Sequence, residues 1–348
     1  MTTPPSPEKQ RLLVFACHEA WIYQLRNLAY ALDIVVGLRG RPAGWDEKMR
    51  PVPSNARLIR LEEVLARPQP YACIIAHNLT DLLDARPLRG PRLLVLHETL
   101  DGAALEQALP VPIASFREAV AKFVSLSGTH VVAVSPLKGR SWGFEDDVVP
   151  FSADARHYKP WQGDLAQGLR VSNHVLRRPR ILMWEFHQRA FAGLPVTLVG
   201  RNPGLAGVEP SAGWDYLKET FSRHRFYIHT ADPRLEDGYN MATLEAMAAG
   251  LPVLGNRHPT SPVEHGVSGF LADDPVELRG YALRLLEDRA LAERMGEAAR
   301  EAVEKRFSPG RFQKNFTRSI ETARSRWLQT RDGNADADQT VYAVEPAN

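Results

Sequence analysis

A segment in the C-terminal half of the sequence combines a glycine, the start of a helix pattern and two spaced carboxylates. It reads LEDGYNMATLEAMAAGLPVLG and spans Leu235–Gly255. Gly238 permits backbone conformations that are closed to other residues, so we expect a chain reversal there and free amides at residues 239–242. A helix start of this kind binds phosphate through its N–H groups and its dipole. The segment therefore predicts an anion site at the start of a helix.

Two carboxylates flank this predicted anion site. Asp237 precedes the helix and Glu245 follows eight positions later, inside it. Met241 and Glu245 are a little over one turn apart, so both can face the same side of the helix. One carboxylate would suit the hydroxyls of a sugar and the other those of a ribose. From the residues alone an alternative stays open, in which Asp237 only caps the helix and Glu245 lies on a solvated face.

The same segment resembles the carboxylate-x7-Glu signature of retaining, family-4-like glycosyltransferases with the GT-B fold. Glu245 and the Ala-Met-Ala that follows it match the family pattern directly, whereas Asp237 stands where the family usually has Glu. The stretch PVEHGVSGFLADDP (residues 262–275) is similar to the next element of the family. VVAVSPLKGRSWGF and VVPFSADARHYKP (within residues 131–160) resemble its inter-domain stretch. The resemblance implies two facing Rossmann-like domains and a nucleotide-sugar donor.

Basic residues follow a predicted strand in SNHVLRR, residues 172–178. The family has an Arg here and a Lys five residues later, and Asn173 and Arg178 occupy that spacing. The resemblance implies that Arg178, with Arg177 beside it, neutralises the donor diphosphate, which a forked guanidinium contact can do. Arg201, after the strand PVTLVG, is a further candidate for the same anion. The alternative is that Arg177 and Arg178 are simply solvated.

In the N-terminal half, His97 ends the apolar run LLVLH, and the family has a His near the donor sugar at a comparable strand end. Glu98 is adjacent and could pair with an acceptor hydroxyl. His18 and Glu19 open the first predicted helix, where many family members carry glycines, and they could line the acceptor or sugar pocket. A lone His after a strand is often only structural, and that interpretation also stays open.

Taken together, the resemblance implies transfer of a sugar from a UDP- or GDP-linked donor to an acceptor hydroxyl, with retained configuration and no metal ion or cofactor. Alternatives are an epimerase or phosphorylase of the same fold, or a non-catalytic protein that binds sugar nucleotides. The implied catalytic residues are His97, Asp237 and Arg178. The implied donor-binding residues are Asn173, Arg177, Arg178, Gly238, Tyr239, Asn240, Met241 and Glu245, and the acceptor-side candidates are His18, Glu19 and Glu98.

These residues require a scaffold that brings strand ends together. Apolar runs without alternation predict strands that are buried on both faces, and helix patterns lie between them, which indicates an α/β fold with parallel sheets. Ligands bind at the carboxyl ends of such strands. The predicted strands of the first domain are 11–17, 33–38, 73–76, 92–97 and 130–134, with helices at 20–32 and 114–126. The second block has predicted strands at 168–173, 195–200, 225–230 and 251–256 and helices at 181–191, 241–250, 275–306 and 309–328.

A proline- and glycine-containing stretch at about 150–168 predicts the linker between two domains. We therefore expect an N-terminal, acceptor-side domain at 1–155, a nucleotide-sugar-binding domain at 156–328 and a flexible tail at 329–348. The resemblance implies that the last helix crosses back onto the first domain.

The composition excludes several other classes. The 348 residues carry 43 Lys plus Arg and 41 Asp plus Glu, a formal charge of +2, which gives no support to a nucleic-acid-binding surface. Two cysteines, Cys17 and Cys73, argue against a disulfide framework or a Cys-based zinc site and favour a reducing compartment. The sequence has no apolar run of the length that a membrane-spanning helix needs, and its start lacks the centre of a signal peptide. We expect a cytoplasmic protein, with contact to a membrane surface left open.

Overall fold

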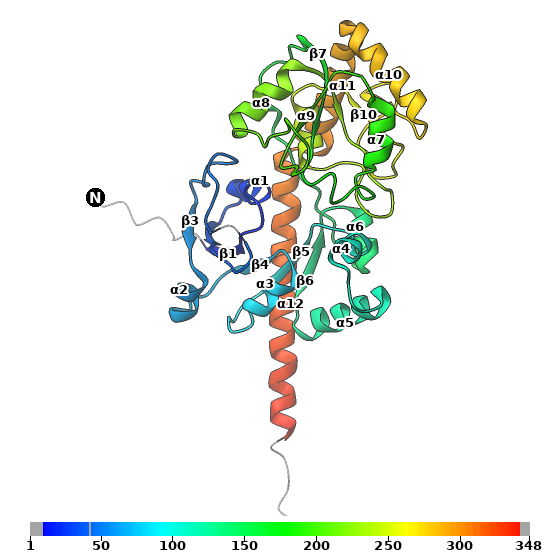
Figure 1. The fold of residues 1–348 in the computed structure, drawn as a ribbon. Coiled ribbons are helices and arrows are strands. Elements are labelled where there is room, and N and C mark those ends of the chain that lie inside the picture. Colours follow the sequence, from blue (N-terminus) through cyan, green and yellow to red (C-terminus); the bar gives the residue numbers. More distant parts are fainter. Residues whose placement is uncertain (1–9, 42, 342–348) are drawn as a thin grey trace, which may run out of the picture.

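Two parallel sheets, each covered by helices, make up the chain (Figure 1). The computed structural model describes residues 10–41 and 43–341, with the backbone alone for residues 331–341. The first sheet has six strands in the order β3-β2-β1-β4-β5-β6. They are β1 Arg11–Phe15, β2 Ala31–Val35, β3 Ala56–Ile59, β4 Cys73–Ala76, β5 Arg92–Leu96 and β6 His130–Ala133.

The second sheet has five strands in the order β11-β10-β9-β7-β8. They are β7 Leu165–Val171, β8 Val196–Val199, β9 His224–Ile228, β10 Val253–Gly255 and β11 Gly269–Leu271. All pairings in both sheets are parallel. The α/β fold with two doubly wound domains that the sequence predicts is therefore confirmed.

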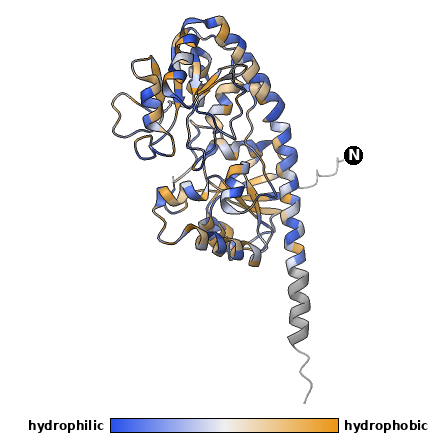
Figure 2. Cartoon of the chain, turned by 90° about the vertical axis from the view of Figure 1, so that its right-hand side faces the viewer, coloured by the Kyte–Doolittle hydropathy of each residue, from blue (hydrophilic) through white to orange (hydrophobic). Residues whose placement is uncertain are grey.

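The central strands are apolar on both faces because helices cover both sides of each sheet. Leu12, Leu13 and Val14 of β1 have no exposed surface, although consecutive side chains point to opposite faces. In Figure 2 hydrophobic residues gather on the strands at the centre of each domain. The sequence does not reveal β3, which is a half-exposed edge strand, or β11, which has only three residues.

The strand order indicates where each domain is expected to bind a ligand. In the first sheet the order reverses between β1 and β4, and in the second it reverses between β7 and β9. Loops from such neighbouring strands leave to opposite faces of the sheet, so a crevice forms at their carboxyl ends. The segments after β1, β4, β7 and β9 are therefore the expected site of binding.

The helices of the first domain are α1 Glu19–Ile22, α2 Leu61–Ala66, α3 Leu79–Asp84, α4 Leu100–Gln107, α5 Ile113–Leu126 and α6 Pro136–Trp142. The predicted helix at 20–32 is wrong beyond its first turns. The chain continues from α1 as the 3₁₀ helix η1 Tyr23–Asn27, and β2 already begins at Ala31, which pairs with Arg11. Sheet pairing overrides the helical spacing of the apolar residues here, because their burial is also satisfied by two short turns.

In the second domain, α7 Trp184–Phe191, α8 Trp214–Arg223, α9 Met241–Ala248, α10 Pro275–Glu287 and α11 Arg289–Arg306 surround the sheet. The chain crosses from the first domain after α6, through the 3₁₀ helix η2 Ala155–His157, to β7. This crossing lies where the sequence predicts the linker.

The last helix, α12 Pro309–Val341, runs back along the first domain and contacts β4, β5 and β6 (Figures 1 and 2). Phe312 and Phe316 are buried there, and the ring of Phe316 lies 5.6 Å from that of Trp21. This is the crossing that the resemblance implies. The predicted tail at 329–348 differs from the structure, since the helical backbone continues to Val341 through a stretch without proline; residues 342–348 lie outside the described residues. Among the described helices, none has the length and apolar character needed to cross a membrane.

Candidate functional site

The segment with the two carboxylates lies between β9 and α9, at the carboxyl edge of the second sheet. Asn240 caps α9, and its Oδ1 accepts a hydrogen bond of 2.9 Å from the amide of Thr243. The Thr243 hydroxyl in turn accepts from the amide of Asn240 at 3.3 Å. Within the described residues, the amides of Met241 and Ala242 have no such partner. Fewer backbone amides are therefore free at this helix start than the sequence predicts, because Asn240 caps the helix and its own amide is already bonded.

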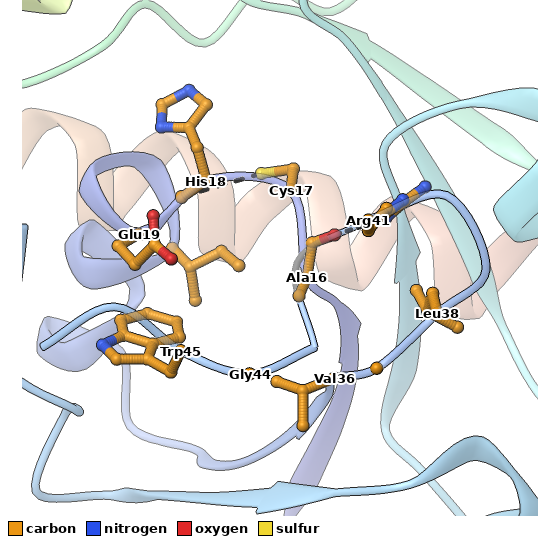
Figure 3. A pocket seen from close by; sticks show the side chains of 11 residues that line it. Ala16, Cys17, His18, Glu19, Val36, Leu38, Arg41, Gly44 and Trp45 are labelled. Carbon is orange, nitrogen blue, oxygen red and sulfur yellow. Dashed lines mark hydrogen bonds between the residues drawn. The ribbon is translucent and has the colours of Figure 1, made fainter. Parts of the chain in front are cut away.

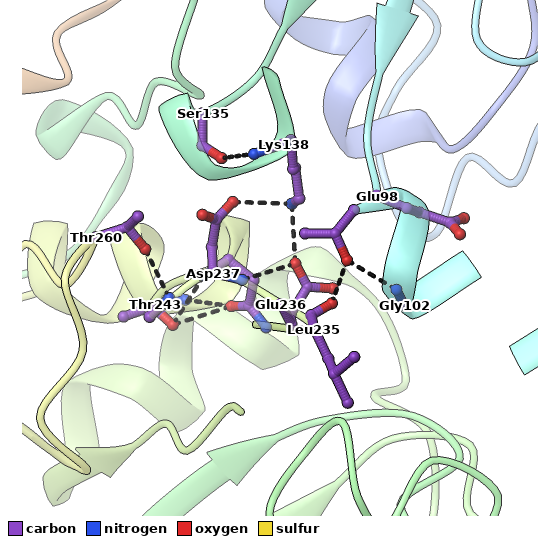
Figure 4. Close-up of polar contacts among 12 residues, drawn as sticks. Glu98, Gly102, Ser135, Lys138, Leu235, Glu236, Asp237, Thr243 and Thr260 are labelled. Carbon is purple, nitrogen blue, oxygen red and sulfur yellow. Dashed lines mark hydrogen bonds and ion pairs between the residues drawn. The ribbon is translucent and has the colours of Figure 1, made fainter. Parts of the chain in front are cut away.

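Gly238 is needed for close packing and not for an unusual backbone conformation. Gly238 is not among the glycines with positive φ. The prediction that the chain reverses here because glycine permits unusual backbone conformations is therefore wrong. A Cβ at this position would lie 2.7 Å from the Cβ of His258. The Gly238 amide donates to the Thr260 hydroxyl at 2.9 Å (Figure 4). The glycine lets the loop pass against residues 258–260, which fixes the position of Asp237.

This packing predicts the effect of Gly238→Ala. The added methyl group must move His258, and overpacking of this kind costs roughly 1–3 kcal/mol. We expect a lower melting temperature and a displaced Asp237, measured by calorimetry and by nucleotide binding. Gly280→Ala serves as the control, because nothing lies within 4 Å of a Cβ there. Equal stability of the two variants would contradict this role of Gly238.

Asp237 forms a buried charge cluster with Lys138 and Glu236. Lys138 comes from α6 in the first domain, and its Nζ lies 2.9 Å from Glu236 and 3.0 Å from Asp237 (Figure 4). Burial acts to lower the pKa of Lys138, but the two carboxylates outweigh it and raise that pKa above its ordinary value. Burial acts to raise the pKa of Glu236, but Lys138 and Arg178 hold it below its ordinary value. Lys138 therefore stays protonated, held between the two carboxylates.

Arg178 brings a second cation to the same place. Its Nε lies 3.0 Å from Glu106 of α4, and its guanidinium lies 3.6 Å from Glu236. Glu236 is thus the point at which the two cations converge. Arg177 is exposed and points to no charged partner within the described residues. Of the predicted pair of arginines, the structure brings only Arg178 into the cluster.

The side chain of Asn173 makes a structural contact through its Oδ1. Its Oδ1 accepts a hydrogen bond of 2.7 Å from the amide of Arg201 and so ties the end of β7 to the end of β8. The Arg201 side chain is exposed. Neither residue supplies a charge beside the cluster, so the positive charge comes from Lys138 and Arg178.

Glu245 contacts the first domain across the domain boundary. It is 7% exposed and pairs with Arg50, which is 3% exposed. Arg50 also donates to the carbonyl of Met49 at 2.6 Å, and its guanidinium lies 4.1 Å from the ring centre of Trp214. Glu245 is therefore a buried, paired carboxylate, and the solvated-face interpretation is wrong.

Tyr239 does not present its side chain to this site. The ring is 4% exposed and lies 5.5 Å from Phe307 and 6.3 Å from Phe151. The ring therefore belongs to the core, and the donor-binding role of Tyr239 stays a prediction that concerns its backbone amide.

His97 lies at the end of β5, where it meets His77 from the end of β4. Nδ1 of His77 and Nε2 of His97 are 2.8 Å apart, and the ring of Trp21 packs edge-on at 5.2 Å from His97. Burial lowers the pKa of His77 to about 3 and takes that of His97 well below its ordinary value. Both imidazoles are therefore neutral at pH 7, and His97 is held in one orientation as a hydrogen-bonding group.

A ligand atom of Cys17 also lies within 4.8 Å of those of His77 and His97. Cys and His are ligands of zinc and other soft ions. An ion here would have to replace the bond between the two imidazoles and take the proton of Cys17, whose pKa burial raises to about 12. Among the described residues this is the one group with the composition of a metal site.

The remaining acceptor-side candidates line two different pockets. His18 and Glu19 border a pocket at the end of β1, together with Trp45 and Arg41 (Figure 3). Glu98 follows His97 and lines a second pocket on the other side of β4. Glu98 and His97 therefore line the same pocket, whereas His18 and Glu19 line a different one.

Sequence reasoning missed Lys138, Arg50 and Glu236. Lys138 carries a signal, since it follows a strand and the helix-capping Ser135 in SPLKGRSW, where a cation would reach the sheet edge. Arg50 lies in an irregular loop and carries none. Together the two domains bring three cations, Lys138, Arg178 and Arg50, to the free amides of α9 and to the carboxylates of Glu236, Asp237 and Glu245. Cations and amides hold a diphosphate, and carboxylates hold sugar hydroxyls.

The chain resembles known proteins in sequence and in structure. Residues 177–316 match a family described as glycosyl transferase-like. The chain is 37% identical over 76 residues to N-acetyl-alpha-D-glucosaminyl L-malate synthase of Bacillus anthracis. That match spans 21% of this chain and 20% of the relative.

Solved structures resemble the chain over a longer range. HepE of Anabaena, in complex with UDP-glucose, has a TM-score of 0.65 and 16% identity, covering 90% of this chain and 99% of HepE. TarM of S. aureus, in complex with Fondaparinux, alpha-GlcNAc-glycerol and UDP, has a TM-score of 0.55 and 12% identity, covering 71% of this chain and 55% of TarM. At these identities the likeness shows the fold, which is GT-B.

Proposed function

We propose that the chain, which has the GT-B fold and matches a glycosyl transferase-like family over residues 177–316, is a glycosyltransferase that moves a sugar from a nucleotide-sugar donor to an acceptor hydroxyl, with retained configuration and without a metal ion. The observation that carries the proposal is the convergence of Lys138, Arg178 and the start of α9 on one point between the domains. Two cations, one from each domain, that meet near free amides are what a diphosphate requires. The UDP-glucose bound to HepE favours a uridine donor.

The proposed donor lies along the carboxyl edge of the second sheet. Its diphosphate takes the place of Glu236 between Lys138 and Arg178, which lie 2.9 and 3.6 Å from that carboxylate. Glu245 accepts from the ribose hydroxyls once Arg50 releases it. Asp237 accepts from the sugar hydroxyls through its Oδ1, which has no partner within the described residues, while its Oδ2 lies 3.0 Å from Lys138. His97 faces the sugar from the opposite domain.

In the proposed reaction the bond between C1 of the sugar and the diphosphate oxygen breaks with its electron pair on the diphosphate. The acceptor oxygen forms the new bond to C1 on the same face, and its proton goes to the departing diphosphate. Lys138 and Arg178 stabilise the charge that develops on the leaving group, and positioned charges of this kind supply most of the rate enhancement in many enzymes. The protein contributes positioning and electrostatics and needs no side-chain nucleophile.

Product analysis tests this function. The full chain is incubated with UDP-glucose carrying a ¹³C label at C1 and with a panel of hydroxyl acceptors, with and without EDTA. We expect release of UDP only with an acceptor, an α-linked product from the α-linked donor, and the same rate with EDTA. A β-linked product would exclude retention, a conversion of the donor without acceptor would indicate an epimerase, and loss of rate in EDTA would exclude metal independence.

A further inference from the structure

A pocket in the first domain opens beside His97. Its cavity volume is ≈ 290 Å³. Ligand pockets in proteins measure about 300–1,000 Å³. The pocket lies between the ends of β4 and β5 on one side and α4, α5 and α6 on the other. Its position places an occupant between the helices and the reacting end of the proposed donor.

Part of the pocket wall is apolar and contains two aromatic rings, while Asn78, Thr80 and Gln107 add polar groups elsewhere in the lining. Leu94 and Leu96 of β5 form the floor, and Ala103 of α4 lines one side. Phe116 and Trp142 line the opposite side, with ring centres 6.2 Å apart and planes inclined by 55°. The Trp142 indole donates to the carbonyl of Glu98 at 2.9 Å, so its ring is fixed. The walls therefore offer a preformed apolar slot for a flat group.

One end of the pocket is polar, and its charge has one sign. His77, His97 and Glu98 gather there, and Nε2 of the 8%-exposed His77 has no hydrogen-bond partner among the described residues. Glu98 is the one charged residue among those that line the pocket, and no lysine or arginine joins it. Desolvation and the neighbouring carboxylates of Glu106 and Glu236 raise the pKa of Glu98, and together they outweigh the nearby cations Arg178 and Lys138, which act to lower it. This end accepts a hydroxyl and disfavours an anion.

Resting on the proposed function, we propose that this pocket binds the acceptor and that the acceptor is a neutral alcohol or sugar carrying an apolar, ring-sized group. The ring fills the slot between Ala103, Phe116 and Trp142, and the hydroxyl lies at His97 and Glu98. An acidic acceptor such as malate lacks a cationic partner in the pocket. The substrate class therefore differs from the one in the name of the B. anthracis relative.

Three matched probes test this proposal without donor: phenyl β-D-glucopyranoside, methyl β-D-glucopyranoside and L-malate. Burial of the ring predicts that the phenyl glucoside binds the full chain at least about tenfold more tightly than the methyl glucoside. We expect no saturable binding of malate. Calorimetric titration measures all three. Equal affinity of the two glucosides, or tighter binding of malate, would overturn the proposal.

Two neighbouring substitutions locate the slot. Ala103→Phe fills it and is expected to abolish the preference for the phenyl glucoside. Ala104→Phe, one position along α4 and facing a different hollow, is expected to retain that preference. Trp142→Ala removes one wall and is expected to weaken the preference, which keeps the test valid if Ala103→Phe does not fold. A preference that survives both Ala103→Phe and Trp142→Ala would place the ring elsewhere and refute the assignment.

UDP binding, measured on the same samples, separates this proposal from the proposed function. UDP that binds while the two glucosides bind equally would refute the acceptor class alone. A preserved phenyl preference without any UDP binding would refute the proposed function and leave the apolar slot supported.

Discussion

Arg178→Ala lowers the rate of sugar transfer by about 100- to 1,000-fold, the loss that follows removal of one group that stabilises developing charge. Arg178 lies at the point where the leaving diphosphate is expected, and its guanidinium can form a forked contact that one ammonium group cannot replace. The fold tolerates the change, because Glu106 is partly exposed and Glu236 keeps Lys138 as its partner. Steady-state kinetics on a productive donor and acceptor measure the effect, which should fall mainly on kcat.

Arg177→Ala is the matched control for this prediction. It removes the same charge from the neighbouring residue, whose side chain is exposed and outside the cluster. We expect kcat and KM within about twofold of the parent protein, since an exposed charge contributes little. Similar losses in both variants would mean that net charge near the loop, and not the position of Arg178, matters for the reaction.

Glu245→Gln abolishes detectable binding of the ribose hydroxyls and lowers transfer by about 100-fold or more, the scale for loss of a charge-assisted pair in a buried site. It also destabilises the fold, because Arg50 then lacks its counter-charge. Breaking a buried ion pair from one side costs about 3–5 kcal/mol. The sequence alone would predict activity loss with an intact fold, and the contact with Arg50 changes that expectation.

Arg50→Met combined with Glu245→Gln separates stability from function. Replacement of both partners removes the unpaired charge, so the double variant should recover most of the lost melting temperature. Nucleotide binding should stay lost, because Glu245 is still absent. Urea unfolding of the four proteins of this cycle gives the coupling energy. Recovery of nucleotide binding in the double variant would show that Glu245 serves only the contact between the domains.

Features that depend on residues close together in the chain could be predicted from the sequence, whereas features that depend on distant residues could not. Patterns of neighbouring residues predicted the buried strands, most helices and the helix start after Asp237, because burial on two faces and capping are decided within a few residues. The helix expected at 20–32 failed where pairing of Ala31 with Arg11 required a strand. Pairing between distant segments leaves no periodic signal.

The sequence by itself predicted two doubly wound domains, a helix start at Asn240 and the position of Glu245 about one turn further along that helix. Only the tertiary structure decided which charges complete that site. Lys138 and Arg50 come from the first domain and meet Asp237 and Glu245 across the boundary, 99 and 195 positions away in the chain. Two charged residues become partners because the fold brings them close together in space. The spacing of residues along the chain does not reveal such proximity.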